Sequence, residues 1–444
     1  MEILLRSALM LTEHPLCNPC LGRQFALLGY GTENENRGDA IKLLLTMKGH
    51  QTMISEDNDG VALLKIVASN GSYDLAIGLL TRLGENADPE NSCFLCEGKF
   101  KEIDKVTEKI LRKLKNYEFK TFLIGVELPL KIAEQEDEFK ARFSVTHGES
   151  MKSQFSRDIG KRVSQLIDKK VDYKNPDLVI LINPFTNKTR LQINPLYIAG
   201  RYRKLVRGIP QSRWLCGDCI GEGCEKCNWT GKKYQESIEG LIGNPMLEVA
   251  EGKEITLHGS GREDVDARML GSGRPFVLEI KEPRRRILDL QKLEQTINKR
   301  AKGKIEIHKL CFTNKNMVRR LKKMESAEKV YRTVIEFGCE ISDGELERVE
   351  KALSNSTIYQ QTPNRVLHRR ADLTREKHIY KAKIKRLAPN RAEMQIHCQG
   401  GLYIKELVTG DEGRTKPSVK DILDIEAMPL HLDVLSVVIG KEEK

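Results

Sequence analysis

The sequence predicts a multidomain α/β protein, and three observations support that fold class. The chain has 444 residues, which is too long for one ordinary hydrophobic core and favours about two or three domains. Hydrophobic residues make up 39% of it, which is enough to build such cores. Apolar residues recur at helical spacing in the first hundred residues, whereas helical and strand-like segments alternate afterwards. We therefore expect a helical region at 1–100, a small α/β region at 101–237 and a larger α/β domain at 238–444.

Helices are expected throughout the first region. Residues 39–47, 61–67 and 73–83 carry apolar side chains at helical spacing. Residues 1–11 also have an apolar face, but no basic leader or cleavage site, so they predict an amphipathic helix and not a signal peptide. No apolar run approaches the ~20 residues needed to span a bilayer. A soluble, cytoplasmic protein without a membrane partner is therefore expected.

The second region is expected to alternate helices and strands. Residues 119–127 and 177–182 are strand-like, and 190–194 follow the second of these after a turn. Between them, Phe155, Ile159 and further apolar residues up to position 167 mark one face of a helix. A glycine-rich segment with four cysteines closes the region.

The third region begins near residue 238 and is also expected to be α/β. Residues 265–270 and 275–282 predict a hairpin that turns at Gly271-Ser-Gly273. Helical patterns at 288–299 and 315–323 follow. Further strands are expected at 304–312, 327–337, 378–385, 392–398 and 402–408.

Basic residues are concentrated in one segment of this third region. The formal net charge is +11, and residues 281–329 hold 16 Lys and Arg against 6 Asp and Glu, a difference of +10. A second basic run extends from Arg365 to Lys381. Clustered cations of this kind bind a phosphate backbone through counterion release, although a solvated helix face or a thermophile-like surface would also carry them. The local excess favours a nucleic-acid partner.

Eight of the 11 cysteines form four Cys-x-x-Cys pairs, which are Cys17/Cys20, Cys93/Cys96, Cys216/Cys219 and Cys224/Cys227. Each pair can present two thiolates to one metal, so that two pairs complete a tetrahedral, structural zinc site. Zinc is favoured for the last two pairs, with an iron–sulfur cluster or a redox dithiol as alternatives.

The first two pairs would close a second site only if the helical insert between them brings its ends together. Independent free thiols are the alternative. One or two zinc ions are thus expected. The other cysteines, Cys311, Cys339 and Cys398, are expected to be buried small hydrophobes.

Three separated motifs carry the chemistry. Gly261-Arg-Glu-Asp264 places a carboxylate on a tight loop, although a solvated turn would look the same. The segments Leu373-Thr-Arg-Glu-Lys-His-Ile-Tyr380 and Gly401-Leu-Tyr-Ile-Lys-Glu-Leu407 add an aromatic and a basic residue. Asp266 lies two residues beyond Asp264, and its position alone does not separate the two carboxylates.

Together these motifs resemble those of pseudouridine synthases, with Gly-Arg-x-Asp as the element that carries the catalytic Asp. The residues 262–283, 362–370 and 410–418 are similar to the archaeal and eukaryotic tRNA pseudouridine synthase family that modifies uridines 54 and 55 of the TΨC arm. That family also has a cysteine-knuckle region and a THUMP-type RNA-binding module. The resemblance spans nearly the whole chain. It implies a C-terminal catalytic domain with a mainly antiparallel central sheet, and a zinc-stabilised N-terminal half with a THUMP-like module that grips tRNA.

The resemblance also implies residue roles. Asp264 would be the nucleophile, Lys405 would favour its charged form, and Tyr380 would stack on the flipped uracil or assist proton transfer. Arg262 would steady the loop or fill the vacated stack. Further substrate contacts are expected from Leu407, Arg369 and Arg370. Such isomerisation implies no metal, nucleotide or redox cofactor for catalysis. Taken alone, Tyr380 and Lys405 would be an ordinary half-buried tyrosine and a solvated lysine.

Two other enzyme classes fit these motifs less well. A methyltransferase with a THUMP module needs a glycine-rich strand-to-helix turn, but Gly259-Ser-Gly261 runs into strand-like sequence. A thiolation enzyme needs an ATP phosphate loop, and Gly-x4-Gly-Lys-Ser/Thr does not occur in the chain. A zinc-stabilised tRNA-binding protein without activity remains the alternative, and only Asp264 with its partners distinguishes the two.

Overall fold

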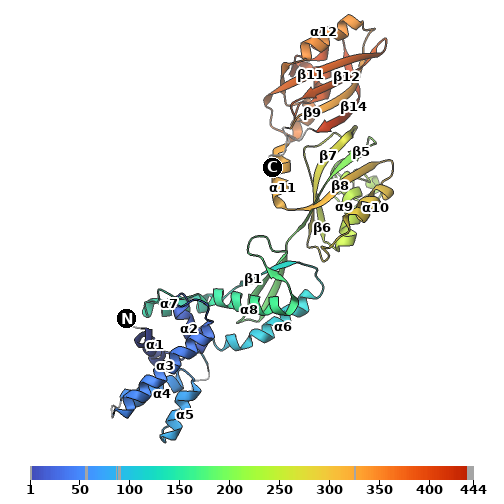
Figure 1. The fold of residues 1–444 in the computed structure, drawn as a ribbon. Coiled ribbons are helices and arrows are strands. Elements are labelled where there is room, and N and C mark those ends of the chain that lie inside the picture. Colours follow the sequence, from blue (N-terminus) through green and yellow to red (C-terminus); the bar gives the residue numbers. More distant parts are fainter. Residues whose placement is uncertain (1–2, 56–58, 87, 89–91, 325–326, 438–444) are drawn as a thin grey trace. The chain divides into compact units, whose positions relative to one another are not determined.

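The computed structural model describes residues 3–55, 59–86, 88, 92–324 and 327–437. The chain divides into two compact units, Met1–Asn194 and Pro195–Lys444 (Figure 1). The predicted boundary at residue 237 falls inside the second of these units. Residues 196–204 form a strand between two strands of the large sheet, so the segment that precedes the second cysteine group is part of the second unit. The predicted boundary at residue 100 stays a prediction.

The first unit begins with helices, as the apolar periodicity predicts. These are α1 (Ile3–Glu13), α2 (Asn18–Gly22), α3 (Asn34–Ile54), α4 (Asp59–Ser69) and α5 (Asp74–Arg82). The start of the predicted amphipathic helix, at Met1 and Glu2, lies outside the described residues.

A small α/β layer completes the first unit. Its elements are α6 (Ile103–Leu114), β1 (Thr121–Val126), α7 (Leu130–Arg142), α8 (Met151–Ile167), β2 (Lys170–Val171), β3 (Leu178–Asn183) and β4 (Lys188–Ile193). The sheet order is β2-β1-β3-β4; β1 is parallel to β2 and β3, and β4 is antiparallel to β3. Helix α8 packs on β1 through Phe155, Ile159 and Val163, all fully buried. One hydrophobic core runs from Met10 to Ile182, so the helices and the sheet share it.

The second unit is built on a ten-stranded sheet. Its strands are β5 (Leu196–Lys204), β6 (Glu254–Gly259), β7 (Ala267–Lys281), β8 (Ile305–Thr313), β9 (Lys329–Phe337), β10 (Ser356–Gln361), β11 (Thr374–Ala388), β12 (Arg391–Cys398), β13 (Thr415–Lys416) and β14 (Ala427–Val437). The order is β13-β10-β11-β12-β9-β14-β7-β5-β8, with β6 paired to β7. Among the described residues, every strand pairing in this sheet is antiparallel except that of β14 with β7. The expected mainly antiparallel sheet is confirmed.

Helices cover each half of this sheet with its own core. They are α9 (Ile238–Ala250), α10 (Leu290–Arg300), α11 (Lys315–Lys323), α12 (Asp343–Leu353), α13 (Ile404–Thr409) and α14 (Val419–Leu423). Helices α12, α13 and α14 pack against the β9 to β12 half, and α9 and α10 pack against the β5 to β8 half. The parallel β14–β7 pair joins the two halves.

Two local predictions in the second unit are wrong. The expected hairpin across Gly271-Ser-Gly273 is one long strand, β7, that bulges there: Tyr202 pairs with Arg274, but Lys204 pairs with Met269. Gly271 and Gly273 have φ of 55° and 73°, so they serve a bulge and not a turn. The expected strand at 402–408 is a helix, α13, because its apolar run is short and a buried helix and a buried strand look alike at that length.

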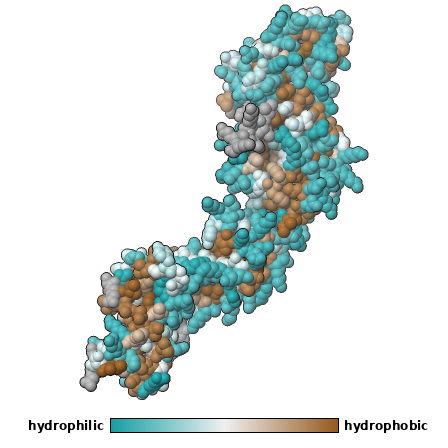
Figure 2. Space-filling view, in the orientation of Figure 1, coloured by the Kyte–Doolittle hydropathy of each residue, from teal (hydrophilic) through white to brown (hydrophobic). Residues whose placement is uncertain are grey.

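No helix among the described residues is long and apolar enough to cross a membrane. Apolar side chains are nevertheless exposed on the helices of the first unit. Met47, Ile54 and Leu75 are 58%, 68% and 58% exposed. Figure 2 shows brown, apolar areas over this helical part of the surface.

Candidate active site

Asp264 lies on the loop that joins β6 to β7. The loop ends where the backbone N–H of Ala267 donates to the carbonyl of Asp264, 3.0 Å away, and Ala267 then pairs with Leu432 of β14. The parallel pair β14–β7 is where the two halves of the sheet join. The carboxylate is therefore held at the centre of the second unit, on an element short enough to be rigid.

A buried ion pair anchors this loop from below. The Glu263 carboxylate accepts from Arg274 Nε at 2.7 Å and from the Tyr202 hydroxyl at 2.8 and 2.9 Å. The side chains of Arg274 and Glu263 are 2% and 0% exposed. A buried charge without a partner is costly, so Glu263 must stay paired with Arg274. This pairing fixes the backbone at Glu263 and thereby the position of Asp264, the next residue.

Further bonds hold the loop backbone. Lys204 Nζ donates to the carbonyls of Val265 and Asp264, at 2.8 and 3.3 Å. Burial lowers the pKa of Lys204 to about 8. Gln211 Nε2 donates to the carbonyl of Gly261 at 3.1 Å, and Gly261 has a φ of 76° that favours glycine. The loop is thus bonded on both sides of Asp264.

Arg274→Met is expected to lower the free energy of unfolding of the second unit by about 3–5 kcal/mol, because it leaves the Glu263 carboxylate buried without a cation. Urea denaturation would measure this loss. Arg300→Met is the matched control, since it breaks an ion pair with Glu248 in which both side chains are more than half exposed, and it should change stability little. Equal losses in the two variants would show that the buried pair does not stabilise the loop.

Two cations contact the Asp264 carboxylate. Arg365 donates to it through Nη1 and Nη2, at 3.3 Å to Oδ1 and 3.2 Å to Oδ2. Lys405 Nζ, from α13, lies 3.6 Å from Oδ2. The same ammonium is closer to Asp266, at 2.6 and 2.8 Å from its two oxygens. Burial favours the neutral acid of Asp266, but the hydrogen bond and charge of Lys405 hold its pKa below the usual range.

Arg365 is a site residue that sequence reasoning missed. It stands in the basic run, yet no motif connects it to Asp264. The guanidinium is itself held by Glu406, whose buried carboxylate lies 2.6 Å from Nε. Burial disfavours the charged guanidinium, but bonds to Glu406 and Asp264 outweigh this and hold the pKa of Arg365 above its usual range. Arg365 is therefore a fixed, permanently charged partner of Asp264.

A cavity of about 210 Å³ opens beside Asp264. Its cationic lining consists of Arg262, Arg274, Lys329, Arg365, Arg370 and Lys405. Glu263 and Asp264 are the carboxylates in that lining, so positive charge predominates. Tyr331, Leu432 and Ile404 also line it, although none of these was predicted as a site residue. Burial raises the pKa of Tyr331 well above its usual range, so its ring is neutral.

The predicted site residues do not all meet in this cavity. Asp264, Lys405, Arg262 and Arg370 line it. Tyr380 does not: its ring, 40% exposed, packs 4.9 Å from His378 and 5.0 Å from His397.

Two further predictions concern Leu407 and Arg369. The α13 helix turns Leu407 into the core, where it is fully buried and is not among the residues that line the cavity. Its expected substrate contact stays a prediction. The Arg369 side chain lies outside the described residues.

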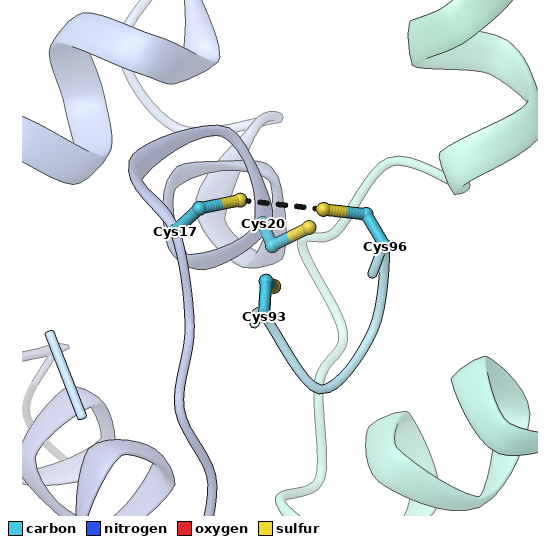
Figure 3. A group of neighbouring side chains, drawn as sticks. All are labelled: Cys17, Cys20, Cys93 and Cys96. Atoms are coloured by element: carbon cyan, nitrogen blue, oxygen red, sulfur yellow. Dashed lines mark hydrogen bonds between the residues drawn. The ribbon is translucent and has the colours of Figure 1, made fainter. Parts of the chain in front are cut away.

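The cysteine pairs assemble as predicted into two tetrads. In each of them, Cys17/Cys20/Cys93/Cys96 and Cys216/Cys219/Cys224/Cys227, the four sulfur atoms lie within 4.8 Å of one another. Figure 3 shows the first tetrad, in which the thiols point toward a common centre. Two tetrads of thiols in this arrangement could each hold a metal ion.

The other three cysteines, all expected to be buried, differ in their exposure. Cys398 is buried, but Cys311 and Cys339 are exposed, so burial is wrong for those two.

Comparison with known proteins identifies the family. The sequence model described as Pus10, C-terminal matches residues 197–438, and that of the archaeal Pus10 THUMP domain matches residues 106–183. The tRNA pseudouridine synthase Pus10 of Methanocaldococcus jannaschii is 45% identical over 96% of this chain and 93% of its own. That of Methanothrix thermoacetophila is 40% identical over 95% and 92%.

A solved Cbf5-Nop10-Gar1 complex also aligns with 53% of this chain and 47% of that chain, at 11% identity and a TM-score of 0.30, a likeness too weak to support an argument. The two family matches and the relatives, which are 45% and 40% identical over most of the chain, agree with the sequence motifs. The chain belongs to the Pus10 family of pseudouridine synthases, which are isomerases.

Proposed function

We propose that this protein converts uridine to pseudouridine in tRNA, at position 54, position 55 or both of the TΨC arm, with Asp264 as the nucleophile. One observation carries the proposal: a carboxylate is held between Arg365 and Lys405 at the edge of a cationic cavity that also presents the ring of Tyr331. The name of the relatives, tRNA pseudouridine synthase, supports the same reaction.

The reaction is an isomerisation, so its atoms balance without a co-reactant. The glycosidic bond between N1 of uracil and C1′ of ribose breaks, the base turns, and a bond between C5 and C1′ forms. The proton leaves C5, and N1 is protonated. Asp264 would attack C1′ or help to expel the base, which requires the ionised carboxylate. Arg365 and Lys405 would hold that carboxylate in place through their ion pairs with it.

The cavity suits a base that has left its stack. Its volume and its apolar walls would enclose one uracil; these walls are Ala267, Leu402, Ile404, Leu432 and Val434. We assign the contact with that base to Tyr331 and not to Tyr380, because Tyr331 lines the cavity and Tyr380 does not. The role first expected of Tyr380 is therefore proposed for Tyr331.

Tyr331→Leu is expected to lower kcat for pseudouridine formation about 10²-fold, because it removes both the ring and the hydroxyl group from the cavity. Tyr380→Leu is the control and should change kcat by about threefold at most, since that ring lies outside the cavity. Single-turnover kinetics on an unmodified tRNA transcript would measure both rates. A larger loss in Tyr380→Leu than in Tyr331→Leu would return the stacking role to Tyr380.

We further propose that both tetrads bind zinc as structural ions, because four thiolates leave no open coordination position for chemistry. The basic segment 281–329 would contact the phosphate backbone of the tRNA. Helix α11 lies within it and carries Arg320, Lys322 and Lys323 in its last turn. Binding should therefore weaken steeply as salt increases.

The test uses purified protein and an unmodified tRNA transcript, without an added cofactor. Carbodiimide labelling and primer extension would map pseudouridine, with cytidine placed at position 54 or 55 in separate transcripts. Stops at one or both positions, lost from the transcript with cytidine there, are the expected result. Tight tRNA binding without any stop would leave a tRNA-binding protein and remove the catalytic proposal.

A further inference from the structure

A second, smaller cavity of about 120 Å³ adjoins the one beside Asp264. The two cavities share six lining residues, which are Arg262, Glu263, Asp264, Arg365, Arg370 and Tyr403. Trp214, Val265 and Val366 line the second cavity alone. The smaller cavity is thus continuous with the proposed catalytic site, but it differs in having an indole ring and two apolar side chains.

Trp214 is held at the base of the second cysteine tetrad. Its carbonyl accepts from the N–H of Lys233 at 3.0 Å, and Leu215 bridges to Lys232. The N–H of Cys216 donates to the carbonyl of Gly231, which closes the segment between them. These bonds tie the position of the indole to the fold of the second cysteine tetrad, because Trp214 lies two residues before Cys216.

The indole ring is in contact with cations. The Arg262 guanidinium lies 4.9 Å from the ring centroid, and Lys233 Nζ lies 5.4 Å from it. The Tyr234 ring meets it edge-on at 5.6 Å. Also in the lining of this cavity, Arg370 Nη1 donates to the Tyr403 hydroxyl at 3.0 Å. Aromatic rings and guanidinium planes side by side are what single-stranded nucleotides bind, through base stacking and phosphate contacts.

We infer that the second cavity is the subsite for the nucleotide that adjoins the target uridine in the RNA strand. Its base stacks against the Trp214–Arg262 pair, and the phosphodiester that links it to the target faces Arg370. The continuity of the cavities favours the adjoining nucleotide as the occupant. When the target uridine lies beside Asp264, the next nucleotide of the strand lies near the residues that both cavities share. The inference rests on the proposed function. It makes the second tetrad part of substrate recognition, through Trp214.

The chain offers a direct probe, because Trp214 and Trp229 are its only two tryptophans. Trp229 is 73% exposed and lines neither cavity, so Trp229→Phe leaves Trp214 as the single reporter. Unmodified tRNA should quench the emission of this variant. Transcripts that are abasic on the 5′ or the 3′ side of the target should still bind, as filter retention would show, but one of them should lose at least about half of the quench. Unchanged emission at saturating tRNA, or equal quenching by all three RNAs, would overturn the subsite.

Steady-state kinetics of a Trp214 variant provide the second test of the subsite. Trp214→Ala in the otherwise natural chain should lower kcat/KM about tenfold on the intact transcript, and it should cause little further loss on the abasic transcript that reduces the quench. Equal losses on the two transcripts would overturn the inference. A tenfold loss of kcat/KM that is accompanied by a loss of bound metal would also overturn it, because the substitution would then act by disrupting the tetrad. If the wild-type protein forms no pseudouridine but the quench depends on the flanking base, then the catalytic proposal fails while the subsite stands.

Discussion

Asp264→Asn is expected to lower kcat for pseudouridine formation at least about 10³-fold, with tRNA affinity changed by about threefold at most. Asparagine keeps the size of the side chain and can still accept a bond from Arg365, so the loop anchored by Glu263 and Arg274 should not move. It has no charge with which to attack C1′. The effect should therefore fall on the chemical step. Single-turnover kinetics and filter binding on the same tRNA transcript would separate the two quantities.

Asp266→Asn is the matched control, because Asp266 lies on the same loop and is the closer partner of Lys405. Its carboxyl group is 66% exposed and is not among the residues that line the cavity. The control should retain kcat within about tenfold, since Arg365 still pairs with Asp264 and Lys405 is freed to approach it. If Asp266→Asn were the inactive variant and Asp264→Asn the active one, the nucleophile would have to be reassigned.

The sequence motif located Asp264, but not the groups that hold it. Asp264, Arg262 and Glu263 are neighbours in a recognisable pattern, and α13 brings Lys405 to the same place. Arg365 reaches Asp264 across 101 positions of sequence, on a segment whose only visible property is its positive charge. A run of basic residues does not show which of them has a fixed side chain. In the structure, the buried Glu406 carboxylate fixes the Arg365 guanidinium.

The proposed role of Tyr331 was not predictable from the sequence for a related reason. Tyr380 and Tyr331 both stand in predicted strands, and β9 and β11 flank β12 in the same sheet. The order of strands decides which of them lies next to β14, β7 and the Asp264 loop, and that is β9. Periodicity predicts strands one by one, but it does not predict their neighbours. Leu407 was likewise assigned from a segment read as a strand, and its burial follows from the helix that the segment forms.

The cysteine pairs show what sequence can predict over long distances. Cys17 and Cys96 are 79 residues apart, yet their sulfur atoms lie 3.5 Å from each other. The prediction succeeded because a four-thiolate site needs two Cys-x-x-Cys pairs, and only one other pair stands in the first unit. Helices α3, α4 and α5 form the insert between the pairs and share one core with both of them.

Cys93→Ser is expected to release one metal equivalent per chain and to destabilise the first unit by several kcal/mol, because structural zinc contributes about 10–16 kcal/mol of binding free energy in small zinc domains. Cys20, Cys93 and Cys96 are all buried in the hydrophobic core, so the loss of a thiolate ligand would be transmitted to the helices packed around it. Metal analysis and thermal unfolding would measure the two effects. Cys339→Ser is the control, because that thiol is exposed and belongs to neither tetrad. It should keep the metal content and the unfolding midpoint of the natural chain. A Cys93→Ser protein with unchanged metal content would show that the first tetrad is a cluster of free thiols, whose proximity serves packing alone.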